Sequence, residues 1–161
     1  MLAKQRGERL KPPPLAHQAE GTLDLALQTL QGEQFDVMGL KGKTVFLHFW
    51  HPACTACLSE IPALNRLYAQ FADGEVAFAA VSTGGLDETK AAVAEAGFSM
   101  PCFLKQGVLP EVYRTRSTPA TFILNPAGEI AFRHLGSARW DDAGAVAYLR
   151  LVSQTEATAA P

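Results

Sequence analysis

The sequence predicts a single α/β domain, a three-layer α/β/α sandwich with a mixed central sheet. Two patterns indicate this fold class. Strands and amphipathic helices alternate from residue 44 onward, which is typical of parallel βαβ units, and two later strands at 120–124 and 129–134 are joined by a four-residue turn, which is typical of an antiparallel hairpin. With 161 residues, 48% of them hydrophobic, the chain can bury one sizeable core but hardly two.

The first elements are a hairpin and a buried strand. Residues 22–30 alternate in polarity, with Leu23, Leu25 and Leu27 on one face, and a turn at 31–33 leads to a second strand at 34–37. Residues 44–50 are almost continuously apolar and rich in β-forming residues, as expected of a central strand that is covered on both faces.

The remaining elements follow from changes in periodicity. A helix begins at Cys54, where apolar residues recur every three or four positions, and ends near Asp73 and Gly74. A second helix has an acidic first turn and ends at Gly97. The other predicted elements are strands at 75–82 and 100–104, a short helix at 108–113 and a last helix at 141–152.

The two ends of the chain are predicted to lie outside the domain. Residues 1–20 form a flexible, basic and proline-rich tail, 21–153 the domain, and 154–161 a disordered C-terminal tail. The longest apolar run, 76–81, is far shorter than the ~20 residues of a membrane-spanning helix, and the N-terminal stretch lacks the apolar core of an export signal. A formal net charge of -2 supplies no general basic field, so we expect no nucleic-acid partner.

Cys54 and Cys57 form a Cys-x-x-Cys pair, a spacing used for redox switching or for metal binding. Their position favours redox chemistry, because Cys54 falls where the strand at 44–50 ends and the helix begins. Free N–H groups and the helix dipole there stabilise a thiolate, which is the attacking species in disulfide exchange. We therefore predict that Cys54 is the exposed nucleophile and Cys57 the more buried thiol that resolves the mixed disulfide.

Further motifs surround this pair: Leu-Lys-Gly-Lys-Thr-Val at 40–45, Phe49-Trp50, Cys54-Thr55-Ala56-Cys57 followed by Glu60 and Pro62, Ser-Thr-Pro-Ala-Thr-Phe at 117–122, and Asn-Pro-Ala-Gly at 125–128. Together they resemble the thioredoxin superfamily and, within it, the membrane-associated TlpA/ResA-like thiol-disulfide oxidoreductases, over about 22–152. The resemblance implies a thioredoxin-like fold with an N-terminal β-hairpin and a β-α insert at 75–97. It also implies an enzyme that reduces disulfides of exported proteins.

The resemblance assigns roles to other residues as well. Pro119 would be a cis-proline packed against the disulfide, Thr118 would present its backbone to an extended substrate, and Trp50 would join them in binding substrate. Glu60, three residues after Cys57 on the same helix, would accept the Cys57 proton if it is desolvated. The plainer alternatives are a strand-entry proline at 119 and a solvated glutamate at 60.

Two histidines are candidate modulators of the pair. His48 occupies the strand position at which thioredoxins have a buried aspartate, where it would relay a proton or stabilise a thiolate; a hydrogen-bonded core histidine is equally consistent with the sequence. His51 is expected at the surface, where a positive charge would modestly favour the Cys54 thiolate. Cys102, the third cysteine, is expected to be buried and structural.

The chain departs from the family pattern at two places. Ala53 stands where the family usually has tryptophan before the first cysteine, and Thr55-Ala56 lacks the proline common between the cysteines. Both changes alter the packing over the disulfide. The redox potential of this pair therefore cannot be taken from the family. The changes do not remove the disulfide exchange chemistry.

The resemblance implies no organic cofactor and no metal, a disulfide-bearing protein as substrate, a membrane-bound thiol as electron donor, and a monomer. It implies an extracytoplasmic location, periplasmic or membrane-anchored with the anchor absent from this chain, while a cytoplasmic location stays open. Reduction is favoured over oxidation, although direction depends on the redox potential relative to the compartment.

Two other functions stay open at this point. A copper-binding or copper-delivery module of the same fold would use both cysteines and one of His48, His51 or His134. A peroxiredoxin would share the fold, but it needs a proline and a threonine upstream of a single peroxidatic cysteine, and the spacing at 52–57 fits this poorly.

Overall fold

The computed structural model describes Leu10 and residues 19–155. The strands are β1 Ala19–Glu20, β2 Leu27–Thr29, β3 Gln34–Phe35, β4 Thr44–Trp50, β5 Val76–Ser82, β6 Cys102–Lys105, β7 Ala120–Leu124 and β8 Glu129–Leu135. The α-helices are α1 Thr55–Ala69, α2 Leu86–Ala96 and α3 Ala143–Ser153, and the 3-10 helices are η1 Val37–Leu40 and η2 Glu111–Tyr113. Within the described residues, the strands form one mixed sheet in the order β1-β8-β7-β4-β5-β6-β2-β3.

Strand β4 lies at the centre of this sheet. It pairs in parallel with β5 and antiparallel with β7, and all seven of its residues are buried. A strand covered on both faces has no solvent side, which explains why its sequence is nearly continuously apolar. Its last residue, Trp50, lies four residues before Cys54, so the cysteine pair lies at the edge of the sheet where β4 ends.

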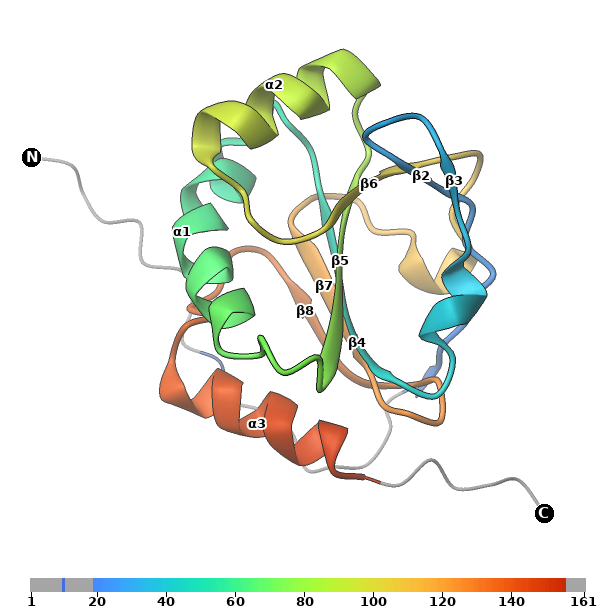
Figure 1. Ribbon diagram of the computed structural model, residues 1–161, viewed down its shortest axis with the longest axis vertical. Helices are drawn as coiled ribbons and strands as arrows, with labels where there is room; N and C mark the ends of the chain where they lie inside the picture. Colours follow the sequence, from blue (N-terminus) through green and yellow to red (C-terminus); the bar gives the residue numbers. More distant parts are fainter. Residues whose placement is uncertain (1–9, 11–18, 156–161) are drawn as a thin grey trace, which may run out of the picture.

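All three α-helices cover the same face of the sheet (Figure 1). The crossovers β4-α1-β5 and β5-α2-β6 both step in the same direction along the strand order. Because parallel crossovers are right-handed, two steps in one direction place both helices on one face. Leu64 of α1 and Leu149 of α3 share this core with Phe46 and Ile123 of the sheet, and the α2 residue Val93 packs against it.

The opposite face is covered by thinner structure. Leu25, Val37 of η1 and Tyr113 of η2 pack there against the sheet residues Phe49 and Phe122. The connections β3-η1-β4 and β6-η2-β7 step back along the strand order, and they carry only 3-10 turns. Within the described residues, no α-helix therefore lies on this face (Figure 1). The α/β thioredoxin-like class with its mixed sheet is therefore confirmed, but one of the two covering layers consists of loops and 3-10 turns.

The ends of several elements differ from the sequence predictions. Strand β2 is shorter than the predicted 22–30, because Thr22 bonds to the Tyr113 side chain instead of to a strand. Ala19 and Glu20, which fall in the predicted tail, pair with β8. The rest of the predicted tails lies outside the described residues, apart from Leu10, Gln154 and Thr155. In the part of the chain that is described, no helix is long and apolar enough to cross a membrane.

Replacing Tyr113 with phenylalanine tests how the N-terminal segment is attached. The hydroxyl donates to the Thr22 carbonyl at 2.7 Å and accepts from the Thr22 N–H at 3.0 Å, and burial raises its pKa, so it remains protonated. Tyr113→Phe leaves both Thr22 groups unpaired, and we expect a loss of about 1–3 kcal/mol in the free energy of unfolding. Chemical denaturation measures this loss.

Tyr68→Phe is the matched control, because the Tyr68 ring packs on Phe78 and its hydroxyl has no hydrogen-bond partner among the described residues. We expect a change within about 0.5 kcal/mol for this variant. Equal losses in the two variants would show that the Tyr113 hydroxyl does not hold the segment.

Candidate functional site

Cys54 and Cys57 form a disulfide at the start of α1, with their Cα atoms 5.2 Å apart. Cys54 is the N-cap residue, and its sulfur accepts a hydrogen bond from the Cys57 N–H at 3.1 Å. Because the first N–H groups of a helix have no partner within it and carry partial positive charge, this position favours a negative sulfur. Cys54 is half-buried, whereas Cys57 is only 1% exposed.

The loop before β7 faces this sulfur. The Thr118–Pro119 peptide bond is cis, as the family resemblance implied, and the Thr118 carbonyl oxygen lies 3.5 Å from Cys54 Sγ. A disulfide sulfur has no hydrogen to donate, so in this oxidised state the approach is a contact. In the reduced state, a Cys54 thiol at this position can donate to the same oxygen.

A buried polar cluster lies in the core one turn beyond Cys57. His48 on β4 and Thr121 on β7 are opposite each other in the sheet, and His48 Nδ1 lies 2.7 Å from Thr121 Oγ1. The other ring nitrogen, Nε2, lies 3.2 Å from Glu60 Oε1 of α1. All three side chains are buried, and Glu60 is only 4% exposed. The alternative of a solvated Glu60 is thus excluded.

The His48–Glu60 contact is an ion pair by distance only. The two facing atoms are not aligned as a hydrogen bond, and neither has another hydrogen-bond partner in the described structure. The second Glu60 oxygen, Oε2, accepts from the Ala138 N–H at 3.2 Å. Because an isolated charge is costly to bury, a carboxyl and an imidazole this close together reduce the cost of burying each other.

The structure does not bring every predicted residue to the site surface. Trp50 is 1% exposed and packs edge-on against Phe98 in the core. His51 is half-buried, and its Nδ1 accepts from the Ala53 N–H at 3.0 Å. The His51 ring also lines the cavity that contains Cys54.

Cys102 lies on β6 and is half-buried, a little more accessible than the sequence predicted. Its sulfur donates to the Met100 carbonyl at 3.2 Å. Desolvation by the surrounding protein raises the pKa of its thiol to about 12. Cys102 therefore remains a protonated thiol at neutral pH.

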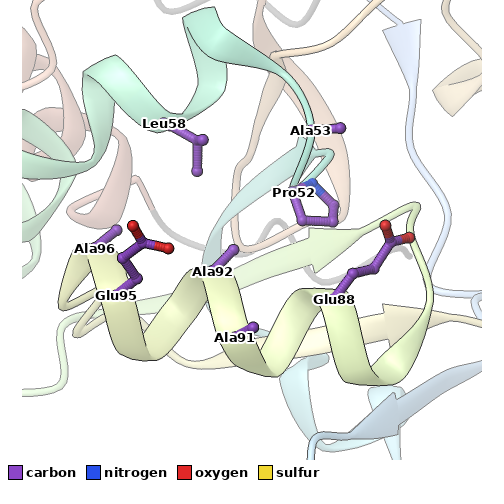
Figure 2. Close-up of a pocket in the computed structure, with 8 residues that line it drawn as sticks. All are labelled: Pro52, Ala53, Leu58, Glu88, Ala91, Ala92, Glu95 and Ala96. Atoms are coloured by element: carbon purple, nitrogen blue, oxygen red, sulfur yellow. The ribbon is translucent and has the colours of Figure 1, made fainter.

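Two cavities meet beside the disulfide, at Ala53. The larger, of about 630 Å³, includes Cys54 and Thr118. The smaller, of about 450 Å³, lies between α2 and the start of α1, where Pro52 and Leu58 face a row of alanines (Figure 2). Sequence reasoning did not find either cavity, although the replacement of a tryptophan by Ala53 was a signal that this surface is open.

Among the described residues, no group of three or more His, Cys, Asp or Glu side chains could hold a metal ion. Of the histidines considered for copper, His48 is held by Thr121 and Glu60, and His134 Nε2 lies 3.4 Å from the Ser137 carbonyl.

Comparisons with known proteins agree with this geometry. The profile of the AhpC/TSA family matches residues 19–133. The thiol-disulfide oxidoreductase ResA of Halalkalibacterium halodurans is 32% identical over 124 residues, which are 76% of this chain and 70% of that protein. These relatives favour neither the copper nor the peroxiredoxin alternative.

Solved structures show the same fold. A secreted disulfide oxidoreductase of Mycobacterium tuberculosis has a TM-score of 0.64 at 25% identity, over 78% of this chain and 96% of that chain. The thioredoxin domain of a thiol-disulfide oxidoreductase from Bacteroides vulgatus has a TM-score of 0.72 at 24% identity, over 87% and 99% of the two chains.

Alkylation after reduction tests the different environments of the three thiols. With limiting iodoacetamide at pH 8, we expect labelling first at Cys54, which is the accessible thiol at the helix N-terminus. A pKa of about 12 lowers the thiolate fraction of Cys102 about a thousandfold relative to a pKa of 9.0, so Cys102 should react far more slowly. Peptide mass spectrometry reads the order, and the denatured chain, in which all three should react alike, is the control. Labelling of folded Cys102 as fast as Cys54 would contradict the assignment.

Proposed function

Because this chain belongs to the AhpC/TSA family and is a thiol-disulfide oxidoreductase, we propose that it reduces disulfides in other proteins by cycling Cys54 and Cys57 between dithiol and disulfide. One observation carries the proposal. The Cys54 sulfur caps α1 and contacts the Thr118 carbonyl, while Cys57 is buried one turn into the helix. An accessible nucleophile and a protected resolving thiol are the two parts that the reaction needs.

In the first step, the Cys54 thiolate attacks one sulfur of the substrate disulfide. A bond forms between Cys54 and that sulfur, and the other substrate sulfur leaves as a thiolate. The Cys57 N–H at 3.1 Å stabilises the negative sulfur before attack. We place the substrate segment in the larger cavity, along the backbone of Thr118 and Pro119, because this cavity contains Cys54.

In the second step, Cys57 loses its proton and attacks Cys54 Sγ. The Cys54–Cys57 disulfide forms, the mixed disulfide breaks, and the second substrate sulfur leaves. Two electrons have then passed from the enzyme to the substrate. We propose that Glu60 takes the Cys57 proton, because both side chains are buried on the same face of α1, three residues apart, where water has little access.

His48 is a positioning residue in this scheme. Its Nε2 lies 3.2 Å from Glu60 Oε1 and its Nδ1 lies 2.7 Å from Thr121 Oγ1, so the carboxylate has a neighbour that is fixed in position. A positive charge on the imidazole would offset a negative charge on the Glu60 carboxylate. The imidazole thereby lowers the free-energy cost of burying a proton acceptor next to an apolar core.

A reductase must be reduced again after each turnover. We propose a membrane-bound thiol protein as the electron donor, a location outside the cytoplasm, and a monomeric enzyme. The family resemblance supports these three points, and one structural relative is a secreted protein. No organic cofactor enters the reaction, because both electrons reside on the sulfur atoms.

The equilibrium redox potential of the Cys54–Cys57 pair tests the direction. We expect one two-electron transition below about -200 mV, in the range of reducing thioredoxin-like proteins. Glutathione and dithiothreitol buffers set the potential, and Cys102→Ser is the background that removes the third thiol. A value near -120 mV, typical of strong oxidants, would assign disulfide formation instead. The absence of any reversible transition would contradict the proposed cycle.

Glu60→Gln tests the proton acceptor. We expect resolution of the mixed disulfide to slow about 100-fold near pH 7, because no base remains beside Cys57. The loss should shrink as the pH rises, since hydroxide then deprotonates the thiol directly. Stopped-flow measurement of substrate thiol release follows this second step. The first step, measured in a Cys57→Ser background that traps the mixed disulfide, should change less than twofold.

Glu95→Gln is the matched control for this substitution, because Glu95 is an exposed glutamate on α2. It should leave both steps unchanged. If Glu60→Gln slowed both steps equally, or if its defect did not depend on pH, Glu60 would have only a structural role.

A further inference from the structure

The larger cavity beside Cys54 is positively charged. Lys105, Arg114 and Arg116 line it, and no aspartate or glutamate is among its lining residues. The chain as a whole has a formal net charge of -2, so this excess of positive charge is local. We call the surface formed by these three cations with Cys54 and Thr118 the basic groove.

Two of the three cations of the basic groove are held in place by backbone carbonyls without being neutralised. Lys105 Nζ donates to the Gly107 carbonyl and Arg114 Nε to the Leu109 carbonyl, both at 2.9 Å. Among the described residues, no carboxylate forms an ion pair with Lys105, Arg114 or Arg116. The rest of each charged group is therefore free to bind a ligand.

The same loop adds an apolar contact. Val108, between the two carbonyls that hold the cations, is 80% exposed and lines the basic groove. An exposed valine among cations suits a polypeptide, whose backbone and side chains are partly apolar, better than it suits a small inorganic anion.

The smaller cavity, on the other side of Ala53, has the opposite charge. Glu88 and Glu95 of α2 border it at the two ends of the alanine row (Figure 2). No lysine or arginine is among its lining residues. The reactive sulfur thus lies on the positive surface, and the negative surface lies beyond Ala53. A negatively charged substrate is therefore attracted to the side of the sulfur and repelled from the smaller cavity.

We propose that the basic groove selects acidic substrates, namely polypeptide segments with aspartate or glutamate side chains next to the cysteine that Cys54 attacks. This inference rests on the proposed function and names its substrate class. Arginine binds carboxylates in a planar, two-bonded geometry, so Arg114 and Arg116 recognise such segments more specifically than a diffuse field would. The attraction acts between exposed groups, and salt must weaken it.

Three peptides of equal length test the proposal. Each has one cysteine as its mixed disulfide with 2-thiopyridine, flanked by glutamates, by glutamines or by lysines. Attack by Cys54 forms the enzyme–peptide disulfide and releases 2-thiopyridone, whose absorbance gives the second-order rate constant. At low ionic strength, we expect the glutamate peptide to react about tenfold faster than the glutamine peptide and the lysine peptide more slowly than either. The differences should nearly vanish in 1 M salt.

The double variant Arg114→Gln/Arg116→Gln should lower the ratio of glutamate to glutamine rates to within about twofold of one. The ratio is the readout because any change in Cys54 reactivity affects both peptides alike. Lys41→Gln/Lys90→Gln is the matched control: it removes the same charge at two exposed lysines that line neither cavity, and it should keep the wild-type ratio.

The possible outcomes distinguish a failure of the acidic selection from a failure of the proposed function. Equal rates for the three peptides in the wild-type enzyme, or an unchanged ratio in the arginine variant, would overturn the acidic selection while leaving disulfide exchange intact. The same fall in the lysine control would also overturn it, because net charge would then explain the preference. If no peptide released 2-thiopyridone, the proposed function itself would fail.

Discussion

The pairing of β4 with β7 is the constraint on which the site depends. In this antiparallel register Phe49 lies opposite Ala120, so the residues that follow β4 and the residues that precede β7 meet at one edge of the sheet. Cys54 and the Thr118–Pro119 loop are 64 residues apart in sequence, yet the Cys54 sulfur and the Thr118 carbonyl are 3.5 Å apart. A shift of one residue in this register would turn the side chains of β7 to the opposite face and separate the loop from the sulfur.

The same register explains the buried polar cluster. His48 and Thr121 are cross-strand partners, and α1 places Glu60 over them. Such groups are costly to bury, and a phenylalanine at 48 would pack without that cost. Beneath a redox pair, these groups fit the proposed transfer of a proton from Cys57 to Glu60.

The surface around Cys54 differs from the core beneath it in being open and charged. Both cavities are open because Ala53 is small, and their opposite charges come from separate elements: the 105–116 segment on one side and α2 on the other. The helix that provides Glu88 and Glu95 belongs to the β-α insert. One face of α2 thus packs against the core and another borders the smaller cavity.

The sequence by itself determined the fold class, the central strand at 44–50 and the redox pair, because periodicity, burial and a strand-to-helix transition are local properties. It also identified Glu60, His48 and Pro119 as separate candidates. Only the tertiary structure decided that Glu60 and His48 are partners, that Trp50 belongs to the core, that His51 accepts a hydrogen bond, and that three cations converge beside Cys54. These facts depend on which residues the register and the crossovers bring together, and on which groups are desolvated there, and neither is encoded in the spacing of residues along the chain.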